Sequence, residues 1–324
     1  MDTRKPHSAA HPPLRAALQA GQRAPSVANT RPWILSDEGD RIALIADTDQ
    51  RLDTADPQAR ELLISCGAAL YNVRAAMRAE GRTPEVAILP DPDRPGRLAE
   101  IAAGRASEPD DEARTHARAI GRRRTHRGLF AADIDDLALV RRLGTAAAAE
   151  GATLQPLTTE PLIRCLAGLV SAAEHLHRHE HSHPHQPANR LRTAAPSPDF
   201  AAHDFPTDPD GDGSDALFPR RDHGHSRIPG MPDSPGAVTG TLALLTTTED
   251  TRAAWLAAGQ ALQRVLLAAA AEGVSAAFHT QPLEEPALRA FTTTRLCDGA
   301  HPQMILRLGR TLPHTATPTD PPPR

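Results

Sequence analysis

The chain has 324 residues, of which 40% are hydrophobic and only 3% aromatic, so it is long enough for one large or two ordinary domains with an aliphatic core. The net charge of −4 gives no overall attraction for nucleic acid, and the only lysine, Lys5, lies in a Pro/His-rich tail, which excludes most lysine chemistry. Three widely spaced cysteines without a CxxC pair argue against a disulfide framework or a thiolate zinc site. Because no apolar run is long enough to span a membrane, we expect a cytoplasmic protein without membrane or nucleic-acid partners.

The first third of the chain predicts alternating helices and strands. Asp56 is a good N-cap with Pro57 at the first helical position, and the apolar stripe that follows ends at Gly81. In order we expect a disordered tail at 1–13, a helix at 14–24, a hairpin of strands 33–35 and 42–46, the helix after Asp56, a buried strand at 86–89, and helices at 94–103 and 110–120.

The remaining chain alternates in the same way around one long polar segment. Residues 177–236 are rich in His, Pro, Asp and Gly, and predict a lid, an excursion or disorder. The tail from Pro313 is too proline-rich to fold alone. We expect helices at 134–149 (capped near Asp133), 159–176, 255–272 and from Glu285, and strands at 153–157, 238–245, 276–279 and 303–308.

Two stretches of the chain share one layout without a gap. Residues 66–92 and 258–284 each read as a long apolar helix, a glycine stop, a short strand and a proline turn, and Gly67 aligns with Gly259, 192 positions later. A compositional echo is the alternative in so Ala-rich a chain, but the glycines, the prolines and the ungapped register argue for a duplication. We therefore predict an α+β protein of two similar halves around one pseudo-twofold axis. Further matches are Ala79-Glu80-Gly81 with Ala271-Glu272-Gly273, Pro90 with Pro282, and Arg97 with Arg289.

Three short motifs occur in order along the chain. Residues 25–33 read PSVANTRPW and are similar to P-S-x-x-N-x-Q-P-W, residues 123–127 read RRTHR and are similar to R-R-S-x-R, and residues 281–284 read QPLE and are similar to a turn placed over a flavin edge. Together they resemble the nitroreductase superfamily, and most closely its actinobacterial Acg branch of FMN-binding proteins. The resemblance covers most of residues 14–310 and fails at 180–235.

This resemblance implies a nitroreductase-like fold and gives the duplication a meaning. Nitroreductases are ordinarily homodimers with FMN at the subunit interface, where one subunit supplies the basic motif and the proline turn and the other supplies the P-S-x-x-N loop. Here the loop is clear only in the first half and the basic motif only in the second. We therefore expect halves at 14–108 and 109–312 fused as an intramolecular pseudo-dimer, with one flavin site in a monomeric chain.

Ten residues of the three motifs would hold FMN by this resemblance. Arginine forks suit a phosphate, the P-S-x-x-N loop would reach the ring or the ribityl hydroxyls, and backbone N–H groups of the proline turn would reach the redox edge. The structural alternatives are a solvated basic turn, an ordinary turn before a strand, and a helix N-terminus. The residues are Pro25, Ser26 and Asn29, then Arg123, Arg124, Thr125 and Arg127, then Pro282, Leu283 and Glu284.

Two departures from the family pattern bear on this site. Glu285 stands where relatives often place glycine, which narrows access to the flavin edge. The tail carries no cation after residue 310 before Arg324, where relatives have a basic cluster, and we consider Arg307 and Arg310 as replacements. Losing charge-assisted contacts of about 1.5–3 kcal/mol each would weaken FMN binding tenfold or more.

Two polar repeats suggest metal ions but fit no closed site. Six alternating histidines at 175–185 would share one face of an extended chain and bind Ni²⁺ or Zn²⁺ weakly, and we interpret them as low-complexity drift. Residues 208–213 match the opening of a calcium loop, but its twelfth position is Pro219 instead of Glu. We therefore expect no metal site.

The resemblance implies an FMN-dependent oxidoreductase in which NAD(P)H is the electron donor and a nitroaromatic or quinone is the small-molecule acceptor, with ping-pong hydride transfer through flavin N5. No side chain stands out as a catalytic acid or base. The alternative is a non-enzymatic protein that binds or sequesters flavin under a lid or in a degenerate site. A third reading is a relative that has lost the cofactor.

Overall fold

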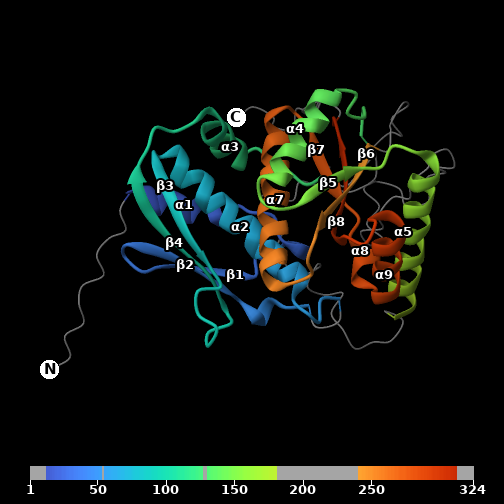
Figure 1. Ribbon diagram of the computed structural model, residues 1–324, viewed down its shortest axis with the longest axis horizontal. Helices are drawn as coiled ribbons and strands as arrows, with labels where there is room; N and C mark the ends of the chain where they lie inside the picture. The colour runs from blue at the N-terminus through green and yellow to red at the C-terminus, as the bar shows by residue number, and fades with distance from the viewer. Residues whose placement is uncertain (1–11, 53–54, 127–129, 181–239, 312–324) are drawn as a thin grey trace, which may run out of the picture.

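The computed structural model describes residues 12–52, 55–126, 130–180 and 240–311. Within them, two four-stranded antiparallel sheets flank two long central helices (Figure 1). The first sheet has the strand order β1-β2-β4-β3 and the second β5-β6-β8-β7, so each strand of one half has a counterpart in the other. The α+β arrangement of two similar halves is therefore confirmed.

The first half follows most of its predicted elements. The strand hairpin is present, with Trp33 opposite Ala46 in the register, and the glycine after the central helix adopts the left-handed conformation expected of a helix stop. In chain order the elements are α1 (Pro12–Gly21), the short 3-10 helix η1 (Val27–Asn29), β1 (Trp33–Asp37), β2 (Arg41–Ala46), η2 (Thr48–Gln50), α2 (Arg60–Ala79), β3 (Arg82–Ile88), β4 (Arg97–Ala106) and α3 (Asp111–Ile120).

The second half repeats the sheet and adds helices around it. Asp136 caps the first of these helices through Ala138 N, three residues later than the predicted cap. In chain order the elements are α4 (Leu137–Ala148), β5 (Thr153–Pro156), α5 (Glu160–Glu180), β6 (Thr241–Thr247), α7 (Arg252–Ala271), β7 (Ser275–Phe278), α8 (Gln281–Glu284), α9 (Pro286–Leu296) and β8 (His301–Gly309).

The central helices α2 and α7 cross at the two aligned glycines. A Cβ atom on Gly67 would overlap the Leu256 carbonyl oxygen, and one on Gly259 would overlap the Ile64 carbonyl oxygen. Gly67 and Gly259 are 192 positions apart, and so are Ile64 and Leu256, so the two contacts occupy equivalent places of the repeat. This reciprocity is what a twofold relation between the helices requires, because each then presents the same surface to the other.

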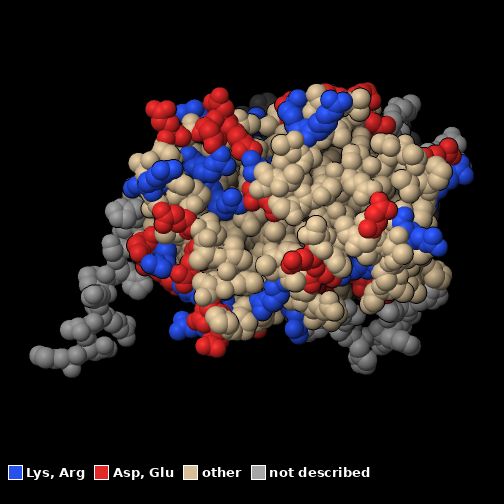
Figure 2. Space-filling view, in the orientation of Figure 1, with Lys and Arg blue, Asp and Glu red and all other residues tan. Residues whose placement is uncertain are grey.

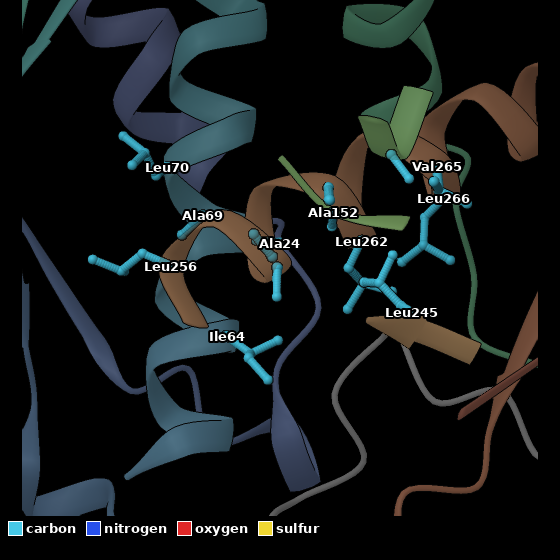
Figure 3. Close-up of a cluster of buried hydrophobic side chains, with 14 of the residues drawn as sticks. Ala24, Ile64, Ala69, Leu70, Ala152, Leu245, Leu256, Leu262, Val265 and Leu266 are labelled. Carbon is cyan, nitrogen blue, oxygen red and sulfur yellow. The ribbon is translucent and has the colours of Figure 1, made fainter. Parts of the chain in front are cut away.

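One apolar core runs through both halves. Its central layer is formed by buried side chains of α2 and α7, including Ile64, Leu70, Leu256 and Leu262 (Figure 3). A second cluster lies between α5 and the outer face of the second sheet, where Leu166 and its neighbours contact β6 and β8. No helix in the part of the chain that the structure describes is long and apolar enough to cross a membrane.

Three predicted features of the first half are wrong. We expect a helix at 94–103, but residues from Arg97 onward form β4. This strand lies between β2 and β3 and pairs with both, so its backbone groups are hydrogen-bonded on both sides. The central helix begins at Arg60 instead of Pro57, and Asp56 accepts a hydrogen bond from Leu62 N. The strand β3 is an exposed edge strand and is not buried.

The polar segment of the second half lies mostly outside the described residues. The helix α5 extends to Glu180, and residues 181–239 are not described, so the lid, excursion or disorder expected at 177–236 stays a prediction for them. His175 lies in α5, in agreement with the helix expected at 159–176, and His177 lies in the same helix, so the extended chain in which the alternating histidines would share one face does not occur at these two positions. Side chains two positions apart do not share one face of a helix.

Candidate functional site

The loop of the first motif is fastened to the start of α2. Val27 N donates a 3.1 Å hydrogen bond to the Ser65 hydroxyl, which in turn donates to the Glu61 carbonyl oxygen. Ser26 Oγ accepts a 2.9 Å hydrogen bond from Arg31 N, and this bond closes the turn. A contact of Ser26 with flavin, as predicted from the sequence, would be made in addition to it. The loop is thus anchored at its centre while Pro25, Ser26 and Asn29 remain partly exposed.

The same loop stores backbone strain. Ala28, Asn29 and Arg31 have φ angles of 47°, 55° and 49°, in the left-handed region that residues other than glycine rarely adopt. Such residues cluster at ligand-binding sites, where the surrounding fold holds them in place at about 1–3 kcal/mol each. Arg31 is also the residue that departs from the glutamine of the family motif, and its side chain is exposed.

The basic motif lies along the edge of the second sheet. Thr125 forms a parallel bridge with Ala276 of β7, and His126 N donates to the Ala276 carbonyl oxygen at 2.8 Å. Arg123 is half-buried and its Nη1 lies 3.3 Å from Thr125 Oγ1. Arg124 is exposed and donates to the carbonyl oxygens of Gly121 and Arg123, so these two arginines of the motif have different environments. Arg127 lies outside the described residues.

The proline turn follows β7 directly and forms α8. Pro282 and Leu283 are buried, whereas the Glu284 side chain is 11% exposed. The three residues before Pro282 are polar, and all are buried: His279, Thr280 and Gln281. Because β7 also carries the bridge to Thr125, the second and third motifs flank one short strand.

A histidine that sequence analysis assigned to low-complexity drift reaches α8. His177 Nε2 lies 3.1 Å from Glu285 Oε1 and 3.7 Å from Glu284 Oε2. These contacts fasten the end of α5 to the turn. The alternating histidines could not predict this contact of His177, because it depends on where α5 ends relative to α8.

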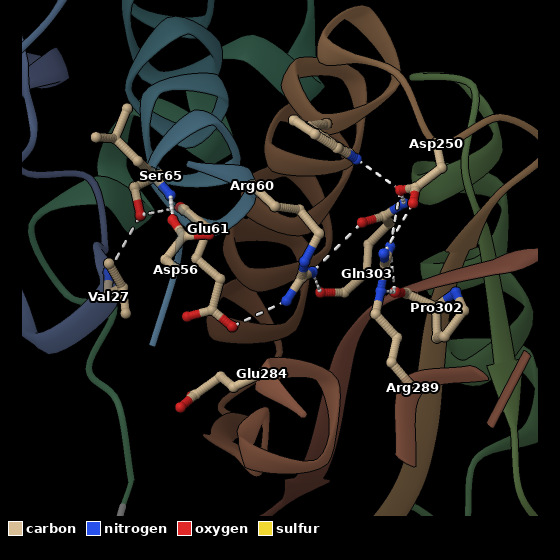
Figure 4. Close-up of polar contacts among 12 residues, drawn as sticks. Val27, Asp56, Arg60, Glu61, Ser65, Asp250, Glu284, Arg289, Pro302 and Gln303 are labelled. Carbon is tan, nitrogen blue, oxygen red and sulfur yellow. Dashed lines mark hydrogen bonds and ion pairs between the residues drawn. The ribbon is translucent and has the colours of Figure 1, made fainter. Parts of the chain in front are cut away.

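A buried polar chain joins the two halves beside these motifs (Figure 4). Arg60 of α2 pairs with Glu61 at 3.0 Å and donates to the Gln303 carbonyl oxygen of β8 at 2.8 Å. Gln303 Nε2 donates to Asp250, which Arg289 binds through two hydrogen bonds. No local pattern of the sequence predicts these contacts, because Arg60 and β8 come together only in the folded protein.

The pKa values of two residues in this buried polar network, Asp250 and Arg60, are shifted from their usual values. Burial by itself would raise the pKa of Asp250, but hydrogen bonds from Arg289, Trp255 and Gln303 outweigh it and hold the pKa well below its usual range. Burial lowers the pKa of Arg60, and neighbouring Glu61 opposes that shift. Asp250 is therefore ionised at neutral pH and pairs with Arg289.

The two arginines considered as replacements for the basic tail have other partners. Arg307 is 1% exposed, donates from Nε to His279 Nε2 at 2.8 Å and lies over the Phe130 ring. Arg310 donates to the Glu272 carbonyl oxygen at the end of α7. Neither contact supports a role for these arginines at the basic motif.

The three motifs therefore lie on, or next to, elements that contact one another at the junction of the halves. The basic motif and α8 share β7, while the P-S-x-x-N-type loop sits on α2, whose first residue contacts β8. In Figure 4 the Glu284 side chain extends from α8 toward the start of α2, where Asp56 and Glu61 lie. The described site thus combines a half-buried arginine, a strained polar loop and a buried polar turn.

One related protein can be aligned with almost the whole chain. The Mycobacterium tuberculosis protein named "Putative NAD(P)H nitroreductase Rv3131" is 32% identical over 321 residues, which cover 96% of this chain and 88% of that protein. The chain belongs to the NAD(P)H nitroreductase family. A second member from the same organism, named "Putative NAD(P)H nitroreductase acg", is 29% identical over 310 residues, with 91% and 88% coverage.

Two further comparisons add little to this nitroreductase assignment. No family model matches the chain. A solved nitroreductase with bound FMN from Bacteroides fragilis aligns with a TM-score of 0.36 and 14% identity, over 64% of this chain and 94% of that one. The assignment to the family therefore rests on the sequence relatives.

The side chains at the three motifs of this nitroreductase have the hydrogen-bonding and charged groups that FMN requires. A phosphate requires cationic and hydroxyl donors, which Arg123 and Thr125 offer beside β7. A flavin ring and its ribityl chain require mixed polar partners, and the buried turn contains an acceptor, Gln281 Oε1, without a hydrogen-bond partner among the described residues. The ten predicted ligands themselves remain a prediction.

Proposed function

We propose that this nitroreductase binds FMN at the junction of its halves and catalyses NAD(P)H-dependent reduction of nitroaromatics or quinones. The observation that carries this is the position of the three motifs. The basic motif lies beside β7, the proline turn follows β7 directly, and the P-S-x-x-N-type loop lies on α2 across the junction. The names of the two Mycobacterium tuberculosis relatives add NAD(P)H and nitroreductase activity as support. The electron donor and the acceptor would use the site in turn, in ping-pong order.

Each motif has a distinct part in this proposal. Bound FMN would supply hydride exchange at its N5 atom. Arg123 and Thr125 would hold the phosphate, with Arg124 and Arg127 contributing charge around it. Pro25, Ser26 and Asn29 would contact the ring or the ribityl hydroxyls. The backbone at Pro282, Leu283 and Glu284 would face the redox edge, where the side chains exclude water.

We further propose that the chain is an Acg-like intramolecular pseudo-dimer with a single flavin site, in the cytoplasm. The halves 14–108 and 109–312 each contain one complete sheet, which supports these boundaries. The loop between α4 and β5 is short and contains Glu150, which accepts hydrogen bonds from Arg74 and Arg264. This ion-paired loop occupies the place where a second P-S-x-x-N loop would lie.

One observation favours the alternative, a non-enzymatic protein that binds or sequesters flavin. Glu285 replaces the glycine of many relatives, and His177 contacts it at 3.1 Å, so α8 is crowded on the side of α5. A covered redox edge would hold flavin without passing hydride to an acceptor. NADPH turnover with menadione or nitrofurazone separates the two, because only the oxidoreductase consumes NADPH.

The direct test is the visible spectrum of the protein after incubation with excess FMN and desalting. Retained flavin at one FMN per chain supports the proposal. Replacing Arg123 with Ala should raise the FMN dissociation constant tenfold or more, since a charge-assisted contact contributes about 1.5–3 kcal/mol. Arg124→Ala, at the exposed neighbour, is the matched control and should have the smaller effect.

Three results would contradict this proposal in different ways. Two FMN per chain would rule out a single surviving site. Equal loss of affinity in both arginine variants would show that general charge, and not the half-buried Arg123, holds the phosphate. Absence of retained flavin would leave a nitroreductase-like fold without its cofactor.

A further inference from the structure

The end of β7 is unusual because it buries three polar side chains in succession. His279, Thr280 and Gln281 are 1%, 6% and 5% exposed, and the buried Pro282 and Leu283 follow. Buried polar groups are normally hydrogen-bonded, since leaving one unsatisfied costs about 1–3 kcal/mol. A run of this kind is therefore maintained only where its polar atoms have partners.

Gln281 departs from this rule. Its Oε1 atom is buried and has no hydrogen-bond partner within the described ranges of the chain. The residue opens α8, the turn that carries the third motif, and its neighbours on β7 carry the bridge to the basic motif. A buried amide acceptor without a partner among the described residues, in the turn that carries the third motif, suits a hydrogen-bond donor that arrives with a ligand.

We infer that Gln281 is a flavin-binding residue whose side-chain oxygen accepts a hydrogen bond from the cofactor. This rests on the proposed function, because it takes the ligand to be FMN. Two donors of a flavin have the required chemistry, the imide N3–H of the ring and a ribityl hydroxyl. Gln281 was not among the ten ligands expected from the sequence, since a lone glutamine before a proline carries no signal of burial.

The test uses Gln281→Leu, which replaces the amide with an apolar side chain of similar size. In the protein without flavin, this variant should melt at the same temperature as the wild type or slightly above, because an unsatisfied acceptor is gone. Its FMN dissociation constant should rise roughly fivefold to tenfold, the loss expected for one neutral hydrogen bond. A higher melting temperature together with weaker binding is the signature that a purely structural role would not produce.

Gln263 on α7 provides a matched control. It is also a buried glutamine whose Oε1 has no partner among the described residues, but its Nε2 donates to Asn72 Oδ1 at 2.7 Å. Gln263→Leu should lower the melting temperature, because it leaves Asn72 Oδ1 without its donor while Asn72 Nδ2 still donates to the Ala20 carbonyl oxygen, and it should leave FMN affinity unchanged. If Gln281→Leu fails to fold, Gln281→Met removes the same acceptor with a more adaptable side chain.

Flavin analogues identify the donor. If N3–H is the donor, Gln281→Leu should weaken riboflavin and lumiflavin alike and leave N3-methylriboflavin unaffected. If a ribityl hydroxyl is the donor, the variant should weaken riboflavin but not lumiflavin, which lacks the ribityl chain. Either pattern supports the inference.

The outcomes that overturn the inference are distinct from those that overturn the proposed function. Wild-type protein that binds no flavin removes both. Wild-type protein that binds FMN, with Gln281→Leu binding it equally well, removes only the role of Gln281. A variant that melts lower and binds FMN normally shows that Gln281 serves the fold.

Discussion

At the scale of single residues, buried titratable groups determine how this nitroreductase responds to pH. The Tyr71 hydroxyl and His116 Nδ1 lie 2.8 Å apart between α2 and α3, and both side chains are buried. Burial lowers the pKa of His116, nearby Glu112 opposes that shift, and Arg264 and Arg78 reinforce it. The folded protein therefore favours the neutral imidazole.

The sign of the pH dependence follows from this depressed pKa. The stability contribution of His116 is complete above its unfolded pKa of about 6.5 and is lost as the pH falls through the lower folded value. We expect the free energy of unfolding to fall by about 1 kcal/mol per pH unit over that window. His116→Gln keeps a partner for Tyr71 and should flatten the dependence, as urea denaturation at pH 7.5, 6.5 and 5.5 would show.

Parallel pH curves for the wild type and His116→Gln would contradict this assignment. The carboxylates that titrate lower down are common to both proteins. They therefore cancel in the difference between the two curves, so that any separation above pH 5 belongs to the imidazole.

At the scale of elements, the crossing of α2 and α7 decides how closely the halves approach. Each helix brings a glycine to the contact, and each glycine faces a backbone carbonyl oxygen of the other helix. Backbone atoms cannot turn aside as a flexible side chain does, so an added methyl group must push the helices apart. The crossing is therefore more sensitive to volume than an ordinary core position.

Replacing Gly67 with Ala should destabilise the protein by about 1–3 kcal/mol through overpacking. The control is Gly144→Ala in α4, where a Cβ atom would meet nothing within 4 Å. There we expect a gain of roughly 0.5–1 kcal/mol, because alanine favours the helix. Chemical denaturation of both variants checks the prediction, and a stable Gly67→Ala protein would show that the helices can separate without loss.

Element by element, the sequence succeeded where one local rule applied. The hairpin, the glycine stops and the helices α3 and α7 follow from turn residues, caps and apolar spacing. It failed for β4, whose Ala-rich segment with Arg97 and Glu100 three positions apart resembles a helix. The same two side chains pair in the strand, and β2 and β3 supply the hydrogen bonds that make it one.

At the scale of the whole molecule, the halves are alike in sheet topology and unlike in chemistry. Figure 2 shows acidic and basic side chains gathered together over the α2 and α3 end of the first half, where Arg78 pairs with Asp110 and Arg264 with Glu112. This face therefore mixes both signs of charge. The three motifs lie on, or next to, elements that contact one another on the side of β7.

We expect the chain to be a monomer in solution, because in the proposed pseudo-dimer the surface that a nitroreductase subunit offers to a second copy is filled by the other half. Light scattering coupled to gel filtration should give a mass near 34.6 kDa across a range of protein concentrations. A mass of twice that value would show that a surface outside the central crossing also associates.

The sequence by itself determined the class, the duplication and the identity of the motifs, since these depend on local spacing and on alignment of one stretch with another. Only the tertiary structure decided which residues of those motifs are buried and what they contact. Arg123 and Arg124 are neighbours with the same chemistry, yet one is half-buried beside Thr125 and the other is exposed. Likewise, the surroundings of Arg60, His177 and Gln281 are set by packing between elements that are distant in the sequence, and no local pattern encodes such packing.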